Sequence, residues 1–452
     1  MVGGPGLFAM IYCTSICANY IPKASLLVKS IKSFDPEAIF VVCLSERQIP
    51  DFSRKNNLFD DIVLAKDLGV PDFDAFMFMH SVVETATSVK GHLFKYLFDA
   101  YPEHRKFVYL DPDIEVFGKL IELEEVLETR SIVVVPHMTE PETKFDSVLD
   151  NEINSMQYGV FNLGFLAVRS DDEGRRFIDW WSERLRMLCF DNVPRGVFTD
   201  QRWIDLAPGF FDVCILRHEG YDVAPWNLSR RLVTRTDGQY LVNGVPLRFY
   251  HFSSFDSKAH VDVMNKYVKD RKNVLYEMWD RYSDTLKNLG QDVYGSYPWS
   301  YARFASGEKI SDATRLRYAI DPVLRRKIND PYASSNKNIR KLFHRHDADR
   351  LGLLLLNKLG ETRSERILVA LEKSKRYRNI IKWYWRFRFM ILTPGRFARK
   401  YFPRSTYLWF SFWISVRDEG PVIALTRLLN FMAHGRGIIA DTEKLDHTGH
   451  DA

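Results

Sequence analysis

An apolar strand, an amphipathic helix and a second apolar strand follow one another near the start of this chain. Residues 8–15 (FAMIYCTS) and 38–45 (AIFVVCLS) are short apolar segments between polar turns, as buried strands are. Between them, YIPKASLLVKSIKSF places Leu26, Leu27 and Ile31 on one face of a helix. Strands joined through a helix lie parallel in one sheet, so we predict a βαβ unit and an α/β fold.

Further strand-like segments and one strong helix continue this pattern. KFVYLDPD, SIVVVPH and GFLAVRS are predicted strands, and EGRRFIDWWSERLRMLCF is a predicted helix. One face of that helix carries Phe177, Trp180, Trp181, Leu185 and Leu188. After about residue 260 the strand pattern ends and helical patterns follow. A chain of 452 residues is too long for one ordinary domain. We predict a catalytic α/β domain over residues 1–265, a mainly α-helical region over 266–440 and a disordered tail over 441–452.

Cysteine usage and hydropathy favour a cytoplasmic setting. The five cysteines lack the spacing of a zinc site. An odd number of cysteines without a secretory signal favours a reducing compartment. We expect no transmembrane helix, because no segment offers about 18 uninterrupted apolar residues. The predicted location is the cytoplasm, with the inner face of the cytoplasmic membrane as a refinement.

Two carboxylates follow directly after the strand-like segment in KFVYLDPDIEVF. In open α/β sheets, ligands bind beyond the carboxyl ends of strands. Asp111 and Asp113 are two residues apart, so in an extended segment they point to the same side, with Pro112 stiffening the turn. Two hard oxygen ligands suit Mg²⁺ or Mn²⁺ on a diphosphate. The alternative for this triplet is a capped turn without a ligand.

A candidate third ligand lies far along the chain. His251 ends another short apolar segment, in LRFYHFSSFD. An imidazole beside two carboxylates favours Mn²⁺ over Mg²⁺, because nitrogen donors suit the softer ion. Alone, such a histidine is more often a packed or surface residue, so its prediction as a ligand depends on Asp111 and Asp113.

Five motifs in order carry a family resemblance: YLDPDIEVF, GVFNLGFLAVRS, FTDQRWIDLAPG, APWNLSRR and FYHFSSFD. Over roughly residues 8 to 260, the chain resembles glycosyltransferase family 8, in a bacterial branch found in polysaccharide-assembly clusters. The resemblance implies the GT-A fold, a Rossmann-like mixed sheet flanked by helices. It implies a nucleotide-diphosphate sugar as donor and Mn²⁺, or alternatively Mg²⁺, held by Asp111, Asp113 and His251.

The same resemblance assigns residues to the nucleoside and the diphosphate. The end of the first strand is implied to bind the nucleoside, through Thr14, Ser15, Asn19 and Tyr20. Tyr20 stacks on the base in this interpretation, or simply packs. The helix before the Asp-x-Asp strand supplies a cation, for which we favour Lys90 over Lys95 because TATSVK resembles the branch's own signature.

Other residues are implied to contact the sugars. Asn162 lies where the family hydrogen-bonds the donor sugar, and Gly164 beside it lets the backbone pass close to a ligand. Asp200 and Gln201 match the pair at the donor's reactive face, although Asp200 also suits a helix N-cap. Trp226 and Asn227 match a loop that lines the sugar or acceptor side.

This sequence departs from the family pattern after its histidine. Ser253 stands where glycine is expected, and Lys258 lies one residue further along than the family's phosphate-contacting lysine. We assign the phosphate role to Lys258.

The predicted activity is transfer of a hexose from a nucleotide sugar to a glycan or lipid-linked saccharide, in surface-polysaccharide or glycan assembly. The resemblance favours retention of the anomeric configuration; an inverting enzyme needs a base on the opposite face, for which Asp200 is the candidate. The alternative function is a catalytically silent GT-A scaffold that binds partner enzymes or membrane through the C-terminal region.

The segment from Lys373 to Arg417 contains no Asp or Glu and interleaves Lys and Arg with aromatic residues. This composition suits peripheral contact with an anionic membrane surface. Docking to a partner transferase and packing in an ordinary helical bundle are the alternatives. Nucleic-acid binding is not favoured, since nothing else in the sequence supports it.

Overall fold

The computed structural model describes residues 9–54, 57–344, 347–348 and 350–355. The chain divides into two compact units, residues 1–360 and 361–452. The basic aromatic segment (373–417) and the predicted tail (441–452) both lie outside the described residues. Helices on both sides of residue 265 belong to the first unit. The predicted domain boundary near this residue stays a prediction.

A seven-stranded mixed sheet forms the centre of the first unit. Its order is β10-β6-β7-β4-β1-β2-β3, and every neighbouring pair is parallel except those made by β7. The strands are β1 (Ile11–Ile16), β2 (Ile39–Leu44), β3 (Asp61–Leu64), β4 (Lys106–Leu110), β6 (Ile132–Val134), β7 (Phe165–Arg169) and β10 (Val213–Ile215). The parallel pairing of β1 with β2 confirms the predicted βαβ unit.

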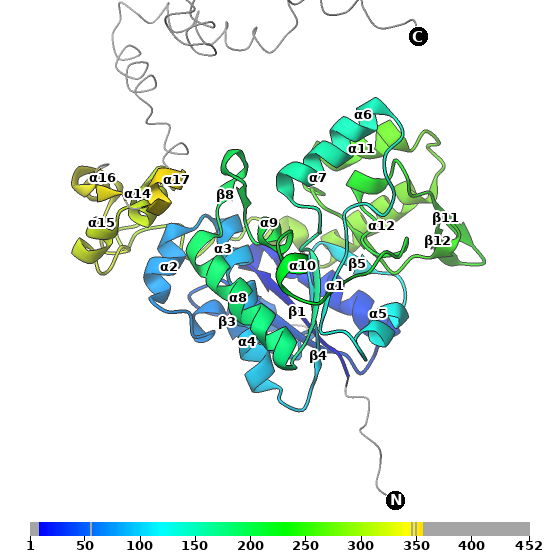
Figure 1. Cartoon of the computed structure of the whole chain (residues 1–452), viewed down its shortest axis with the longest axis horizontal. Helices are drawn as coiled ribbons and strands as arrows, with labels where there is room; N and C mark the ends of the chain where they lie inside the picture. The colour runs from blue at the N-terminus through cyan, green and yellow to red at the C-terminus, as the bar shows by residue number, and fades with distance from the viewer. Residues whose placement is uncertain (1–8, 55–56, 345–346, 349, 356–452) are drawn as a thin grey trace, which may run out of the picture. The chain divides into compact units, whose positions relative to one another are not determined.

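Helices cover both faces of this sheet (Figure 1). Alternate residues of each strand point to opposite faces: Cys13 and Tyr109 pack with α4 (Lys90–Ala100) and α8 (Asp172–Leu188). Tyr12 and Val108 pack on the other face with α1 (Ile21–Phe34) and α5 (Ile121–Val126). Both faces are buried, which explains why the strands are nearly continuous apolar runs.

The side chain of Asp171 caps the start of helix α8. The Asp171 side chain accepts a hydrogen bond from the Gly174 amide, which satisfies one of the free donors of the first turn. Of the predicted apolar face, Phe177, Trp181 and Leu185 are buried, whereas Trp180 and Leu188 are half-buried.

Three small antiparallel sheets extend the central one. Strand β5 (Ile114–Val116) pairs with β14 (Phe249–His251), and this pair positions the candidate site. The others, which the sequence did not predict, are β8 (Asp191–Asn192) with β9 (Val197–Phe198), and β11 (Val233–Thr236), β12 (Gln239–Val242) and β13 (Val245–Pro246).

The remaining described segments are mainly helical, as predicted for the region after residue 260. None of the helices in the described residues is long and apolar enough to cross a bilayer. The further α-helices are α2 (Phe73–Met79), α3 (Val82–Ser88), α6 (Phe145–Ser147), α7 (Ile153–Tyr158), α9 (Gln201–Ile204), α10 (Ala207–Phe210), α11 (Lys258–Tyr267), α12 (Val274–Asn288), α13 (Gln291–Tyr294), α14 (Asp312–Ile320), α15 (Pro322–Lys327), α16 (Asn336–Leu342) and α17 (Arg350–Leu355).

Close packing of α4 on α8 depends on a glycine. A Cβ at Gly91 would lie 2.6 Å from the Cα of Ser182 on α8, so Gly91→Ala forces the helices apart. We expect the free energy of unfolding to fall by about 1–3 kcal/mol in a urea titration. Gly209→Ala is the matched control, since nothing lies within 4 Å of its Cβ position; it gains about 0.4–1 kcal/mol. Equal effects of the two variants would contradict this packing.

Candidate active site

The Asp-x-Asp motif lies in a tight turn between two strands. Asp111 follows β4, and the Ile114 amide that opens β5 donates to the carbonyl of Asp111 at 3.1 Å. A second bond, from the Asp111 amide to the Gly164 carbonyl at 2.8 Å, ties this turn to the residue before β7. The two carboxylates therefore approach each other because the chain turns at Pro112. The prediction of an extended segment was wrong, although the convergence it was meant to explain is present.

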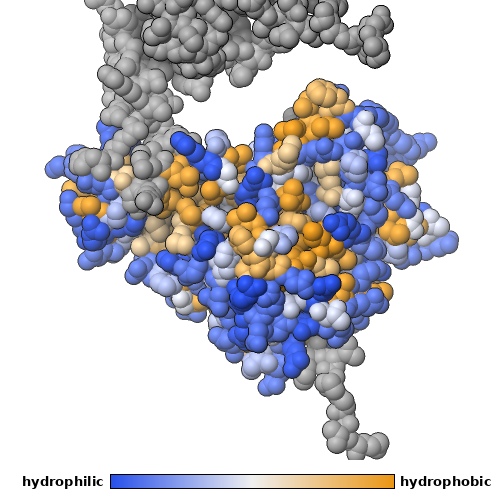
Figure 2. All heavy atoms as spheres, in the orientation of Figure 1, coloured by the Kyte–Doolittle hydropathy of each residue, from blue (hydrophilic) through white to orange (hydrophobic). Residues whose placement is uncertain are grey.

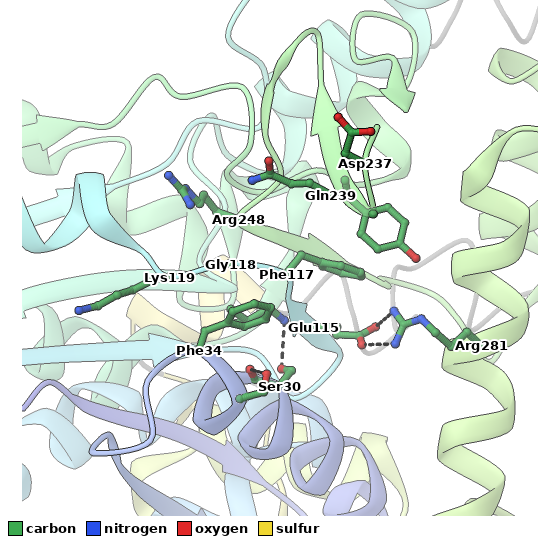
Figure 3. Close-up of a pocket in the computed structure, with 14 residues that line it drawn as sticks. Ser30, Phe34, Glu115, Phe117, Gly118, Lys119, Asp237, Gln239, Arg248 and Arg281 are labelled. Carbon is green, nitrogen blue, oxygen red and sulfur yellow. Dashed lines mark hydrogen bonds and ion pairs between the residues drawn. The ribbon is translucent and has the colours of Figure 1, made fainter. Parts of the chain in front are cut away.

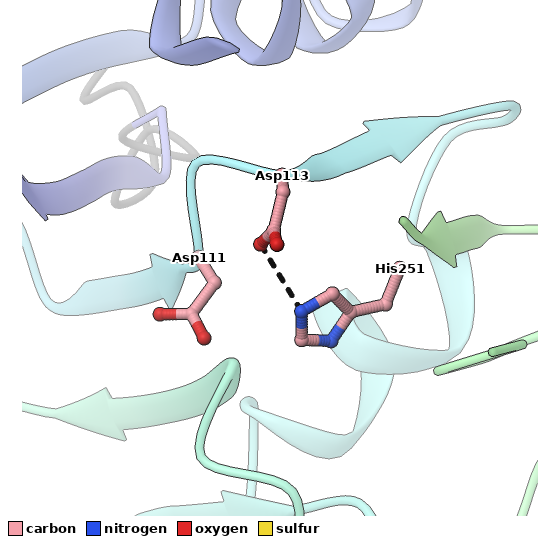
Figure 4. Close-up of side chains that lie close together, drawn as sticks. All are labelled: Asp111, Asp113 and His251. Carbon is pink, nitrogen blue, oxygen red and sulfur yellow. Dashed lines mark hydrogen bonds and ion pairs between the residues drawn. The ribbon is translucent and has the colours of Figure 1, made fainter. Parts of the chain in front are cut away.

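Pairing of β5 with β14 brings His251 to the same place. Ile114 pairs with His251 in this ladder, so the imidazole lies beside Asp113. Its Nε2 is 3.1 Å from Asp113 Oδ1 (Figure 4). One ligand atom each from Asp111, Asp113 and His251 fits within 4.8 Å of the others. The structure thus assembles the three predicted metal ligands from positions 138 residues apart in sequence.

These three side chains suit a divalent cation. Burial opposes ionisation of Asp113, but the neighbouring imidazolium outweighs it and lowers the pKa of Asp113 to about 2. Burial likewise opposes protonation of His251, and the Asp113 carboxylate raises its pKa to about 10. A histidine binds a metal in its neutral form, so a cation that bound here would displace a proton from His251. Two carboxylates and one imidazole form a donor set that fits Mn²⁺.

Lys90, at the start of α4, is buried beside two carboxylates. Its Nζ lies 2.8 Å from Asp200 Oδ2 and 3.3 Å from Asp111 Oδ1, and it donates to the Leu163 carbonyl at 2.8 Å. Burial lowers the pKa of Lys90, but the two carboxylates outweigh it and raise that pKa well above its usual value. Lys95 instead pairs with the exposed Asp179 on α8. Of the two candidate lysines, the structure brings only Lys90 to the metal ligands.

Asp200 has the position of a helix N-cap without acting as one. It precedes α9, but its side chain makes no capping hydrogen bond. The carboxylate instead pairs with Lys90 and accepts from the Thr199 hydroxyl at 3.0 Å. Trp181 of α8 donates to the Asp200 carbonyl at 3.3 Å, which fixes the backbone beneath this ion pair.

The predicted sugar-side residues Asn162 and Gln201 are engaged with backbone groups. Asn162 accepts from the Gly164 amide at 2.8 Å. Gln201 accepts from the Leu163 amide at 3.1 Å and donates to the Tyr158 carbonyl at 3.1 Å. A Cβ at Gly164 would lie 2.6 Å from both Asn162 Oδ1 and His251 Cε1. Any larger residue at position 164 would therefore clash with the side chains of both Asn162 and His251.

The proposed nucleoside residues surround the end of β1. Thr14 is fully buried and its hydroxyl has no hydrogen-bond partner among the described residues. The Ser15 hydroxyl donates to the Ala86 carbonyl at 2.6 Å. Asn19 and Tyr20 are half-buried. Burial, with the nearby Asp113, Asp256 and Asp111, raises the pKa of Tyr20 above its usual value.

The remaining predicted residues lie along β14 and its neighbours. Trp226 packs edge-on against His251, with ring centroids 5.3 Å apart. Asn227 is buried and donates to the carbonyls of His137 and Asp222, so it fixes the loop backbone. Lys258 is the first residue of α11.

Part of the chain matches a known protein family. Residues 12–175 match the family model described as glycosyl transferase family 8. This part of the chain is a glycosyltransferase family 8 domain. The seven-stranded mixed sheet between helical layers confirms the predicted GT-A architecture, and the chain is a glycosyltransferase.

The chain is also similar to proteins of low sequence identity. It is 24% identical over 297 residues to YfnF of Bacillus subtilis, described as uncharacterized, covering 62% of this chain and 93% of that protein. Among solved structures it is similar to the galactosyltransferase LgtC, crystallised with donor and acceptor sugar analogs, at 17% identity and a TM-score of 0.39, covering 62% and 96% of the two chains. GlyE of Streptococcus pneumoniae is 14% identical with a TM-score of 0.33, covering 66% of each chain.

Sequence reasoning missed two residues of the candidate site. The Tyr109 hydroxyl donates to Asp111 Oδ1 at 2.9 Å and lies 3.2 Å from the Ser15 hydroxyl. Its place two residues before Asp111 on a strand was a signal that could have found it. Asp222 lies 3.6 Å from His251 Nδ1. No sequence pattern marked Asp222, because its position follows from pairing beside β14.

Two open pockets flank the β5–β14 pair of the glycosyltransferase. One of about 400 Å³ is lined by Trp226, Ser253 and parts of α7 and α11, directly beside His251. Another of about 820 Å³ is lined by Phe117, Tyr240 and the bidentate Glu115–Arg281 ion pair (Figure 3). None of the predicted site residues lines this second pocket, whereas Trp226, which packs against His251, lines the first.

Removal of the buried lysine tests its electrostatic role. Lys90→Met leaves Asp111 and Asp200 without their shared cation, so we expect the free energy of unfolding to fall by about 3–5 kcal/mol. Lys95→Met removes a partly exposed ion pair with Asp179 and should change it by less than about 0.5 kcal/mol. Chemical denaturation of the full chain measures both. A smaller loss for Lys90→Met than for Lys95→Met would contradict the buried pairing.

Proposed function

We propose that this chain is a metal-dependent glycosyltransferase that moves a hexose from a nucleotide-diphosphate sugar to a glycan or lipid-linked saccharide. The observation that carries the proposal is the convergence of Asp111, Asp113 and His251 at the end of β4. When bound there, Mn²⁺ or Mg²⁺ would neutralise charge that develops on the leaving diphosphate. An acceptor in surface-polysaccharide or glycan assembly, and action at the inner face of the cytoplasmic membrane, belong to the same proposal.

Lys90 supplies a positive charge beside the predicted metal ligands, and its neighbours fix its orientation. Lys90 is held by Asp200 and the Leu163 carbonyl, within 3.3 Å of the metal ligand Asp111. A fixed ammonium group near a diphosphate stabilises the charge that forms there without reorganisation. The Tyr109 hydroxyl holds Asp111 from the other side. These contacts support a diphosphate site at the metal cluster.

The environment of Asp200 supports a retaining reaction. An inverting transferase needs a base that reaches the acceptor hydroxyl opposite the leaving group. Asp200 is only 3% exposed and is engaged by Lys90 and Thr199. In the retaining reaction, the acceptor attacks on the face that the diphosphate leaves, and the diphosphate takes the hydroxyl proton. We therefore assign Asp200 to holding Lys90 in position.

The pocket beside His251 is the proposed acceptor site. Trp226 presents an aromatic ring, which suits stacking on a sugar, and Asn154 and Asp262 offer polar groups. The segment that lines one side of this pocket also exposes apolar side chains on α6 and α7, Phe145 at 75% and Met156 at 56%. Figure 2 shows hydrophobic side chains gathered over these helices. Apolar surface beside a polar pocket supports an acceptor that carries a lipid.

Loss of one metal ligand tests the activity itself. We expect Asp111→Asn to lower Mn²⁺-stimulated turnover of a panel of UDP- and GDP-hexoses by about 100-fold or more, because a carboxylate ligand becomes a neutral amide. Chelation with EDTA should abolish wild-type turnover, and added Mn²⁺ should restore it. Asp212→Asn is the matched control, since that side chain is 70% exposed and pairs with Arg130 on the surface.

A chain that neither binds nor turns over any sugar nucleotide with Mn²⁺ would instead be the catalytically silent scaffold. In that case Asp111→Asn and Asp212→Asn would behave alike in every assay.

Filling the pocket beside His251 separates acceptor binding from donor chemistry. Ala259 is exposed at the start of α11 and lines this pocket. Ala259→Trp should reduce transfer to octyl glycosides about tenfold or more while leaving hydrolysis of the same donor within about twofold, because one indole fills much of the cavity. Ala305→Trp, at another exposed position, is the control. Equal loss of transfer and hydrolysis would place the acceptor elsewhere.

A further inference from the structure

A buried carboxylate behind the metal ligands has no hydrogen bond in the described residues. Asp222 is 0% exposed, and neither of its carboxylate oxygens has a hydrogen-bond partner there. An isolated buried carboxylate is costly, so a cation must compensate it. Two lie near: Asp222 Oδ1 is 3.6 Å from Nδ1 of His251, and the buried guanidinium of Arg231 interacts with the same carboxylate.

The backbone holds Asp222 in this place. Its φ of 54° lies in the left-handed region, which Asp tolerates better than most residues but which still costs free energy. Next to it, the Val223 carbonyl accepts from the His251 amide at 2.8 Å, and the Val223 amide donates to the Phe249 carbonyl at 3.3 Å. Asp222 and His251 are therefore carried by adjacent, hydrogen-bonded segments, and their separation is fixed by the backbone.

The imidazole ring has little room to turn. Gly164 lies against one side, where a Cβ would be 2.6 Å from His251 Cε1. Trp226 packs edge-on against it at 5.3 Å. With the ring confined, Nε2 faces Asp113 and Nδ1 faces Asp222. The remaining freedom is which nitrogen carries the proton.

We propose that Asp222 is the positioning residue of the metal centre: its carboxylate accepts the Nδ1–H of His251 and so presents the Nε2 lone pair to the cation. This inference rests on the proposed metal-dependent function. Histidines that bind metals generally donate their second N–H to a carboxylate, carbonyl or water, which fixes the tautomer and strengthens the ligand. Asp222 itself is not a ligand, since it is fully buried behind the imidazole.

Mn²⁺ titration of the full chain, followed by electron paramagnetic resonance, tests this role. We expect Asp222→Asn to weaken Mn²⁺ binding about 10–100-fold. The free energy of unfolding without metal should fall, because the buried cationic groups near this carboxylate lose their partner. Pulsed measurements of bound Mn²⁺ should show a nitrogen coupling from His251 in the wild type that is diminished in Asp222→Asn. Asp222→Ser, which is smaller, should shift affinity in the same direction.

Asp321→Asn is the matched control. That carboxylate is also 0% exposed, but it caps α15 by accepting from the Leu324 amide at 2.8 Å. We expect it to lower the free energy of unfolding and leave Mn²⁺ affinity unchanged.

Two outcomes overturn the inference, and they differ in what else they remove. Wild-type binding of Mn²⁺ with Asp222→Asn and Asp222→Ser both within twofold refutes the positioning role but leaves the proposed function intact. A wild type that binds no Mn²⁺ removes both.

Discussion

The candidate active site depends on a short antiparallel pairing between β5 and β14. This pairing places His251 opposite Ile114, the residue that follows Asp113. A shift of one residue in such a ladder turns every side chain to the other face, and His251 would then leave Asp113. The ladder is extended at one end by a bond from the Phe252 amide to the Asp113 carbonyl, and at the other by one from the Phe117 amide to the Arg248 carbonyl, both 2.8 Å. These bonds fix the register on either side of the metal ligands.

Helices beyond residue 265 support this pair from behind. Arg281 of α12 makes a bidentate ion pair with Glu115 of β5 at 2.6 and 2.8 Å. Tyr282 stacks on Phe252, with ring centroids 3.8 Å apart and planes within 9°. Both residues of α12 thus contact segments adjacent to a metal ligand. This explains physically why helices after residue 265 belong to the same compact unit as the sheet.

Lys90 joins the other parts of the site in the same way. It contacts Asp111 after β4, the Leu163 carbonyl before β7 and Asp200 before α9. A buried cation with three such partners is strongly favoured only when all of them are in place. Its position therefore depends on the register of β4 and β7 and on the packing of α4 against α8. The positions of the predicted metal ligands and of Lys90 therefore depend on different contacts within one fold.

The sequence predicted those features that local patterns determine. Strand and helix periodicity placed β1, α1, β2 and α8, and a strand-end carboxylate pair indicated Asp111 and Asp113. The place of His251 at the end of another apolar segment made it a candidate third ligand, and the family resemblance supplied Lys90 and Asp200, because no periodicity relates positions so far apart. Neither the local patterns nor the resemblance indicated Asp222, because its position follows from a left-handed backbone conformation and a non-local pairing. The ion pair between Glu115 and Arg281 was also not predicted, because it joins residues 166 positions apart.

The departure from the family pattern after His251 has a structural counterpart. Glycine is expected at Ser253, yet the residue with the left-handed conformation is Ser254, with a φ of 60°. There the Ser254 carbonyl accepts from the Ser257 amide at 3.0 Å, and the Ser257 side chain caps α11 by accepting from the Ala259 amide. A glycine-like turn is thus present one residue later than expected. Since α11 begins at Lys258 directly after this turn, the turn and its serine cap set where that lysine enters the helix.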